Sequence, residues 1–382
     1  MPSTNKTAGS RLAYIDWLRG LACAVMFQTH CYDAWLNDAA RRGPFLRYSQ
    51  IGGTLPAPLF LFLAGVSLAF TTSSMRQRGV AAGETARSTI RRGGEIFLWA
   101  LLFRVQEYVL SLFHAPWTDL LRVDILNCIG VTLVLMAIVC WIVSWSGAAG
   151  PRLRAWNIVA AVGAAAVIAL VTPPLWTTAR PNWLPWWLES YVNGVHIYGV
   201  PQAWLFPIFP WAAFGFVGLA AGFLLSAARA REREMRAVLW FGAAGVAMFL
   251  LGWWIDSLPV RIYAVYDFWH TSPNWFLMRA GVLLVVMLFG YAWCRWGAGE
   301  WGFSPLVQMG QASLLVYWVH IEFVYGDLSL VPKHHHGGIG RATLGLAAIF
   351  VGMTLLAVAR NKWKGRGAEL AAWFRRPAGK TS

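Results

Sequence analysis

Ten long apolar stretches run through the chain, separated by short polar turns or by segments rich in glycine and proline. Each stretch is close to the ~20 residues that a helix needs to cross the hydrocarbon core of a bilayer. The pattern therefore predicts an all-α fold, a polytopic membrane bundle of about ten transmembrane helices. They are placed at residues 13–32, 55–73, 92–113, 123–145, 154–171, 203–226, 237–255, 275–294, 304–326 and 341–359.

The composition excludes an ordinary soluble protein. Of the 382 residues, 58% are hydrophobic and 13% are charged, and the mean hydropathy is +0.50. A soluble domain carries about 25% charged residues. The 24 tryptophans fit the aromatic belts found at membrane interfaces. No loop is long enough for a separate core, so the sequence predicts one membrane domain over 1–360, followed by a basic amphipathic cytoplasmic tail over 361–382.

The net charge of +15 would suit a nucleic-acid partner, but the distribution of the charges argues against one. With the N-terminus inside, the termini and the turns on the same side hold 21 Lys and Arg residues, and the opposite loops hold 7. This is the positive-inside asymmetry of membrane proteins. It predicts the lipid bilayer as a partner, no nucleic acid, and both termini in the cytoplasm.

Neither a disulfide framework nor a metal site is expected. The five cysteines form no CxxC pair, and four of them lie inside predicted helices. The adjacent histidines 334–336 lie in a loop, where side chains of consecutive residues do not easily converge on one ion. We therefore expect no bound metal.

The first predicted helix carries Asp16, Arg19 and His30. Ionisable groups are costly inside a membrane, and they usually mark a pathway or a reaction site. Arg19 and His30 are eleven residues apart, which places them on nearly the same face, roughly 16 Å apart along the helix axis. His30 could act as a general base if the helix continues one more turn to Asp33. Alternatively, Asp16 and Arg19 form an ion pair that locks the bundle, and His30 is an interfacial polar cap.

A second polar stripe lies in the segment QASLLVYWVHIEFVYG, residues 311–326. Ser313, Tyr317 and His320 are spaced i, i+4 and i+7, so they share one face of a helix. Glu322 projects to roughly the opposite side. The stripe indicates either a functional site at the depth of His30 or hydrogen bonding between helices.

Three further groups of polar residues lie in apolar segments. Asp124 and Asn127 begin a helix from the outer side. Either Asp124 is simply an N-terminal cap, or Asp124 or Asn127 orients the acceptor or the catalytic base. Arg104 and Glu107 are spaced for a local ion pair. Arg279 has no carboxylate near it in the sequence, so it needs a partner from another helix or an anionic ligand.

Five segments resemble bacterial proteins of the heparan-α-glucosaminide N-acetyltransferase catalytic-domain family, which belongs to a wider superfamily of multi-pass membrane acyltransferases. They are RLAYIDWLRGLACAVMFQTHCYDAW, APLFLFLAGVSLAF, LRVDILNCIGV, LFPIFPWAAFGFVGLAAGFLL and SLLVYWVH. In related glycan acetylases an arginine, ten intervening residues and a histidine mark the first helix, and Arg19 and His30 match that spacing. The resemblance implies a multi-pass protein of a bacterial cytoplasmic (inner) membrane. It also implies that an acyl group, expected to be acetyl, passes from cytoplasmic acyl-CoA to a sugar or glycan on the outer side.

With this resemblance, the polar residues take provisional roles. His30, oriented by Asp33, would be the general base, and Arg19 would steady the donor or the developing oxyanion. Arg91 and Arg92 would meet the phosphates of acetyl-CoA, the donor co-substrate. The candidate acceptor-binding residues are Asp124, Asn127, Tyr317, His320 and Arg279.

One departure from the family leaves the choice between an amine and a hydroxyl acceptor open. In the animal lysosomal enzyme the proposed catalytic histidine lies in the loop after the first helix, whereas segment 33–54 here contains no histidine. His30 must then take that role. Transfer can be direct or can pass through an acyl-histidine.

Two other functions fit the same residues. A transporter or flippase for a lipid-linked or anionic molecule could use Arg19, Arg279 and Glu107 as a charged path. Transporters often contain two repeated halves, each with an interrupted helix, and the sequence shows no such symmetry. A structural scaffold would be insensitive to His30→Ala. A homodimer is compatible with either function and with the acyltransferase.

Overall fold

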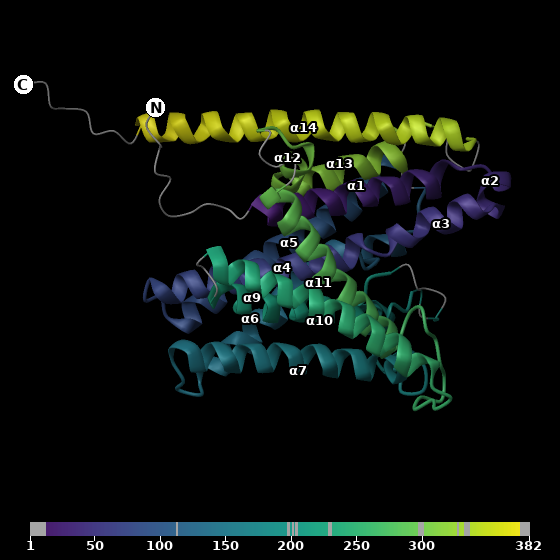
Figure 1. Cartoon of the computed structure of the whole chain (residues 1–382). Helices are drawn as coiled ribbons and strands as arrows, with labels where there is room; N and C mark the ends of the chain where they lie inside the picture. The colour runs from purple at the N-terminus through teal and green to yellow at the C-terminus, as the bar shows by residue number, and fades with distance from the viewer. Residues whose placement is uncertain are drawn as a thin grey trace, which may run out of the picture. The chain divides into compact units, whose positions relative to one another are not determined.

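The computed structural model describes residues 13–111, 114–196, 199–200, 202, 205–227, 231–296, 302–326, 328–331 and 337–374, with the backbone alone for 231–232 and 365–374. Each of the ten predicted spans contains a long helix or, in one case, two shorter ones (Figure 1). Within the described ranges the one β-type pairing is an isolated bridge between Leu36 and Gly337. The all-α prediction is confirmed. The histidines 334–336 and the outer ends of the predicted helices, 112–113 and 203–204, lie outside the described residues.

The chain divides into two compact units, one formed by residues 1–56 and 292–382 and the other by residues 57–291. In the first unit, α1 packs against α3, α12, α13 and α14, and α14 also lies along α12 and α13 (Figure 1). The helices of this unit are α1 (Ala13–Trp35), α2 (Asp38–Arg42), α3 (Pro44–Gly53), α12 (Pro305–Gln311), α13 (Ser313–Val324) and α14 (Ile339–Phe374).

Two glycines allow α1 and α12 to touch backbone to backbone. A Cβ added to Gly20 would lie 1.9 Å from the carbonyl oxygen of Leu306, and one added to Gly310 would lie 1.8 Å from that of Asp16. No real Cβ atom is found so close to another heavy atom. Small residues at such contacts let membrane helices pack closely, so these glycines fix the position of α1 against α12.

The predicted continuous helix over 304–326 is wrong in one respect, because it breaks at Ala312. There φ is −117° and ψ is 18°, so α12 ends at Gln311 and α13 begins at Ser313. The Arg360 guanidinium, from α14, donates a hydrogen bond of 3.1 Å to the Gln311 carbonyl. A charged donor therefore satisfies a carbonyl that a continuous helix would bond internally, and the break is stabilised inside an apolar bundle.

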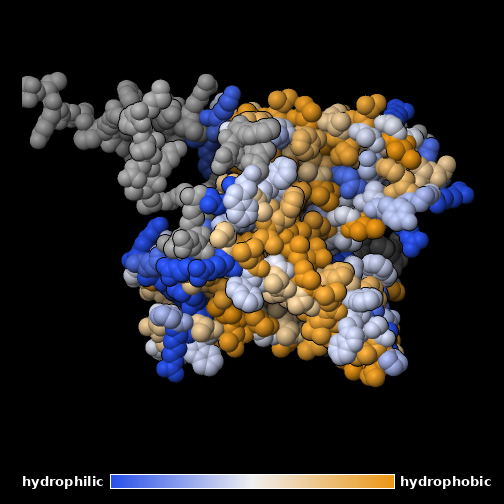
Figure 2. All heavy atoms as spheres, in the orientation of Figure 1, coloured by the Kyte–Doolittle hydropathy of each residue, from blue (hydrophilic) through white to orange (hydrophobic). Residues whose placement is uncertain are grey.

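The second unit contains eight long or intermediate helices and one 3₁₀ turn among its described residues, with α5 packed on α6 and α7 packed on α9. They are α4 (Pro56–Gln77), α5 (Ala82–Leu110), η1 (Trp117–Leu121), α6 (Ile125–Ser144), α7 (Gly150–Trp176), α8 (Trp186–Asn193), α9 (Ile208–Ala227), α10 (Arg231–Ser257) and α11 (Pro273–Trp296). On α4, Gly65 meets the backbone of α9, where an added Cβ would lie 2.0 Å from the Gly215 carbonyl oxygen. Figure 2 shows apolar side chains over the middle of α10 and α11 and hydrophilic ones gathered toward the ends of the helices.

Seven of the described helical segments are long and apolar enough to cross a bilayer. The sequence-based number is ten, and the difference lies in α1, α5 and the broken pair α12 and α13. Charged and polar side chains lower the hydropathy of α1 and α5, and neither half of the broken helix is long enough alone. The protein is a multi-pass membrane protein, and crossing by these three segments stays a prediction.

Candidate active site

A pair of histidines lies near the C-terminal end of α1 in the first unit. His30 on α1 and His320 on α13 are 290 positions apart in the sequence, yet His30 Nδ1 lies 3.0 Å from His320 Nε2. Their rings stack at 5.2 Å between centroids with 8° between planes. His320 is completely buried, against Phe27 and Tyr317, whereas His30 is half-buried. The two polar helix faces seen in the sequence therefore meet.

Hydrogen bonding sets the tautomers of this pair. His320 Nδ1 lies 3.1 Å from the carbonyl oxygen of Val316, and a carbonyl only accepts, so Nδ1 carries the proton. A neutral His320 then has a lone pair on Nε2, which accepts a hydrogen bond from His30 Nδ1–H. The neutral His30 ring is left with its lone pair on Nε2. This is the tautomer of a general base.

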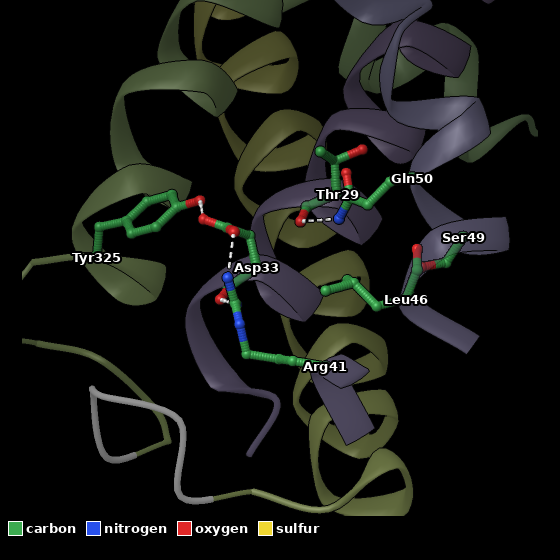
Figure 3. Close-up of polar contacts among 7 residues, drawn as sticks. All are labelled: Thr29, Asp33, Arg41, Leu46, Ser49, Gln50 and Tyr325. Atoms are coloured by element: carbon green, nitrogen blue, oxygen red, sulfur yellow. Dashed lines mark hydrogen bonds and ion pairs between the residues drawn. The ribbon is translucent and has the colours of Figure 1, made fainter. Parts of the chain in front are cut away.

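The carboxylate of Asp33 lies one turn beyond His30 at the exposed end of α1. Its Oδ2 accepts a hydrogen bond of 2.9 Å from the Tyr325 hydroxyl, and its Oδ1 lies 3.4 Å from the Arg41 guanidinium (Figure 3). The Tyr325 ring also meets the His30 ring edge-on at 5.4 Å. Asp33 therefore holds a tyrosine and an arginine at the rim of the histidine pair.

The segment after α1, where the sequence predicts a polar outer loop, folds into α2 and α3. Gln50 Nε2 donates to the Thr29 carbonyl at 3.2 Å, next to the Asp33 cluster (Figure 3), and Gln28 Nε2 donates to the Ser49 carbonyl at 3.1 Å. These bonds tie α3 to the last turns of α1. They fix the backbone that carries His30 and Asp33.

Arg19 lies deeper on the same helix. It forms an ion pair with Asp16 at 3.3 Å, and its side chain is 23% exposed. Because α1 is continuous from Ala13 to Trp35, the eleven residues from Arg19 to His30 span roughly 16 Å along the axis. The local ion pair expected from the sequence is confirmed, and Arg19 does not reach a small group bound at His30.

Other predicted site residues belong to the second unit. Asp124 is the N-cap of α6, and its backbone N–H donates to Asn127 Oδ1 at 3.1 Å. Its carboxylate pairs with Arg104 at 2.5 Å, and Arg104 also pairs with Glu107 at 2.5 Å. The cap and the local pair are confirmed. Nδ2 of Asn127 is buried and has no hydrogen-bond partner among the described residues, so an acceptor role for Asn127 stays open.

Arg91 and Arg92 lie on α5 with side chains 83% and 61% exposed. Both contact the same carboxylate, Glu95, at 3.3 Å and 3.2 Å. The three residues together carry a net charge of only +1, and exposed pairs of this kind contribute little to stability. A phosphate group would have to compete with Glu95 for them.

The remaining candidates are Tyr317 and Arg279. Tyr317 lies on α13 with its ring 5.8 Å from that of His320, so it belongs to the histidine site. Arg279 lies on α11 in the second unit, between the rings of Trp211 and Trp275. Of the predicted residues, the first unit therefore brings together His30, His320, Tyr317 and Asp33 near the C-terminal end of α1. The second unit holds Arg91, Arg92, Asp124, Asn127 and Arg279.

A histidine–aspartate pair in the second unit was not predicted from the sequence. His196 Nε2 lies 3.5 Å from Asp119 Oδ1, and Trp186 packs edge-on against the imidazole. Burial lowers the pKa of His196, and nearby Asp119 opposes that shift. The ring is therefore neutral at pH 7. A lone histidine in a proline- and tryptophan-rich segment gives no sequence signal for this contact.

Comparison with known proteins places these features in a family. Residues 11–253, more than half of the chain, match the protein family described as "Heparan-alpha-glucosaminide N-acetyltransferase, catalytic". A search of curated proteins finds no match. The match covers α1 and its histidine as well as α4 to α9 and most of α10. It supports a membrane acetyltransferase type of activity.

Proposed function

The chain belongs to the heparan-alpha-glucosaminide N-acetyltransferase catalytic family, and we propose that it transfers an acetyl group from cytoplasmic acetyl-CoA to an amine or hydroxyl of a sugar or glycan on the outer side of a membrane. The observation that carries this proposal is the His30–His320 pair. It combines a half-buried imidazole that has a lone pair on Nε2 with a completely buried imidazole that orients it.

His30 is the general base. Its Nε2 removes a proton from the acceptor amine or hydroxyl as the acceptor atom bonds to the acyl carbon. The carbon–sulfur bond then breaks, and the proton that His30 has gained passes to the leaving thiolate, which regenerates the neutral ring. A positioned base of this kind accelerates transfer by about 10²–10⁴-fold.

His320 is a positioning residue rather than the acceptor-binding residue expected from the sequence. Its complete burial and its bonds to His30 and Val316 support this role. Asp33 acts through Tyr325, whose ring it holds beside that of His30, and it also pairs with Arg41. Beside the histidine pair, a hydroxyl oxygen that can accept a hydrogen bond and a nearby cation are thereby available to a polar substrate.

Arg19 contributes to donor binding rather than to the oxyanion at His30, because roughly 16 Å of helix separates the two residues. A fixed cation at that depth suits an anionic or strongly dipolar part of the donor. Arg91 and Arg92 are the proposed contacts for its phosphates at the cytoplasmic edge. Asp124 and Asn127, in the second unit, stay proposed acceptor-binding residues.

The test is transfer of radiolabelled acetyl from acetyl-CoA to a panel of amino sugars and glycans by the purified protein. His30→Ala and His30→Gln should reduce transfer at least ~10²-fold, while acetyl-CoA still binds. Transfer that survives both substitutions would remove His30 as the base. Absence of both transfer and acetyl-CoA binding in the folded wild type would favour the transporter.

A further inference from the structure

Arg279 differs from Arg19 and Arg104, the two other arginines that the sequence analysis singled out inside apolar helices. Arg19 pairs with Asp16, and Arg104 pairs with Glu107 and Asp124. Arg279 has no ion pair and no hydrogen bond within the described part of the chain, and its Nε is buried. An unpaired cation is costly in a membrane protein, and such residues mark ligand sites.

Two tryptophans surround the guanidinium. Arg279 Cζ lies 4.8 Å from the ring centroid of Trp275 and 6.0 Å from that of Trp211. The electron-rich faces of these rings attract the cation. They do not replace the acceptors that its N–H donors need, because a ring face accepts hydrogen bonds only weakly.

Trp275 adds a second orphaned donor. Its indole Nε1–H is buried and has no acceptor among the described residues. Trp275 and Arg279 are spaced i and i+4, so they lie one turn apart on the same face of α11. Buried donors in native proteins are nearly always satisfied, and each exception needs an explanation.

We infer that Arg279, Trp275 and Trp211 form a binding site for an oxyanion, such as a carboxylate or a phosphate. An oxyanion supplies the missing negative charge and several acceptors at once. The guanidinium fork matches two of its oxygens, and the indole N–H serves a third acceptor position. The site lies entirely within the second unit and does not depend on the proposed acetyl transfer.

The anion has two sources, a soluble acid and the headgroup of an anionic phospholipid, whose phosphate, unlike that of phosphatidylcholine, has no choline cation beside it. Arg279 lies within two turns of the start of α11, which follows an outer segment in the predicted topology. Both sources are available there. The ligand chemistry is the same in both cases, so the experiment separates them.

The protein is reconstituted in nanodiscs of zwitterionic phosphatidylcholine without acetyl-CoA. Its thermal unfolding is then followed against inorganic phosphate or glucuronate, and separately with phosphatidylglycerol in the disc. Ligand binding to the folded state raises the midpoint in a saturable way. We expect this rise in the wild type, its loss in Arg279→Gln, and roughly tenfold weaker apparent affinity in Trp275→Phe.

Arg261→Gln is the matched control, because Arg261 donates to the backbone carbonyls of Asp256 and Leu258 and should leave the response unchanged. A response to phosphate or glucuronate identifies a soluble acid, and a response to phosphatidylglycerol alone identifies a headgroup. If Arg279→Gln does not fold, the same titrations are made with Trp275→Phe and Arg279→Lys. No response in the wild type, or an equal response in the variants, overturns the site whether or not the protein transfers acetyl groups.

Discussion

Replacing His320 by phenylalanine should lower the rate of acetyl transfer without weakening substrate binding. Phenylalanine fills the buried space beside Phe27 and Tyr317 but removes both ring nitrogens. His30 Nδ1–H then loses the acceptor that lies 3.0 Å away, and with it the hydrogen bond that sets the tautomer of His30. The base is still present, but it is no longer held with the lone pair on Nε2.

The expected magnitude follows from the lost hydrogen bond. A buried donor left without an acceptor costs about 1–3 kcal/mol, and about 1.36 kcal/mol corresponds to a tenfold change in rate. Because His30 is half-buried, water offsets part of this cost, and we expect kcat to fall by about 5- to 30-fold. KM for the acceptor should stay the same, since His320 is completely buried.

The assay is steady-state transfer of radiolabelled acetyl by His320→Phe, His30→Ala and the double variant. A positioning residue acts only through the base, so the double variant should be no slower than His30→Ala. Phe27→Leu, which alters packing on His320 but no polar contact, is the control. An unchanged kcat in His320→Phe would refute the positioning role of His320. So would a double variant in which the reductions in kcat from the two single substitutions multiply.

Three further predictions concern stability, each measured by thermal unfolding in detergent. Gly20→Ala should destabilise the protein by about 1–3 kcal/mol through overpacking. The control is Gly352→Ala, where an added Cβ meets nothing within 4 Å and stability should not change. Equal effects of the two substitutions would contradict the close contact between α1 and α12. Asp124→Asn keeps the helix cap but loses the pair with Arg104, which should cost about 1.5–3 kcal/mol, and unchanged stability with lost activity would instead assign Asp124 to the acceptor. Because the pKa of His196 is lowered in the folded state, the unfolded chain binds more protons as the pH falls. The contribution of neutral His196 to stability is therefore present above pH ~6.5 and declines below it. His196→Gln should flatten this decline, and a pH profile identical to that of the wild type would contradict the prediction.

Much of the fold was predictable because the membrane imposes a strong rule on the sequence. Apolar runs of spanning length gave ten helical segments, and Asp124 and Asn127 at the start of one run gave its cap. The break at Ala312 was not predictable, since it depends on Arg360 reaching the Gln311 carbonyl from a helix 49 positions further along the chain. The helix propensities of residues 304–326 contain no information about such a donor.

In the candidate site, too, some features were predictable from the sequence and others depend on tertiary packing. His30 and His320 were each identified because polar residues stand out on apolar helices, and their similar depth followed from position along the helix. Their direct contact depends on the approach of α13 to α1. Tyr325 and Arg41 were missed because they lie in or near turns, where polar residues are ordinary. Tertiary packing alone brings them to Asp33.

In the proposed reaction the acetyl group enters on one side of the membrane and leaves on the other. The most direct test uses inside-out membrane vesicles with glucosamine or an impermeant glycan trapped in the lumen and radiolabelled acetyl-CoA added outside. The account predicts labelled acceptor inside the vesicles with the wild type and almost none with His30→Ala. Label that forms only when donor and acceptor are on the same side of the membrane would contradict it.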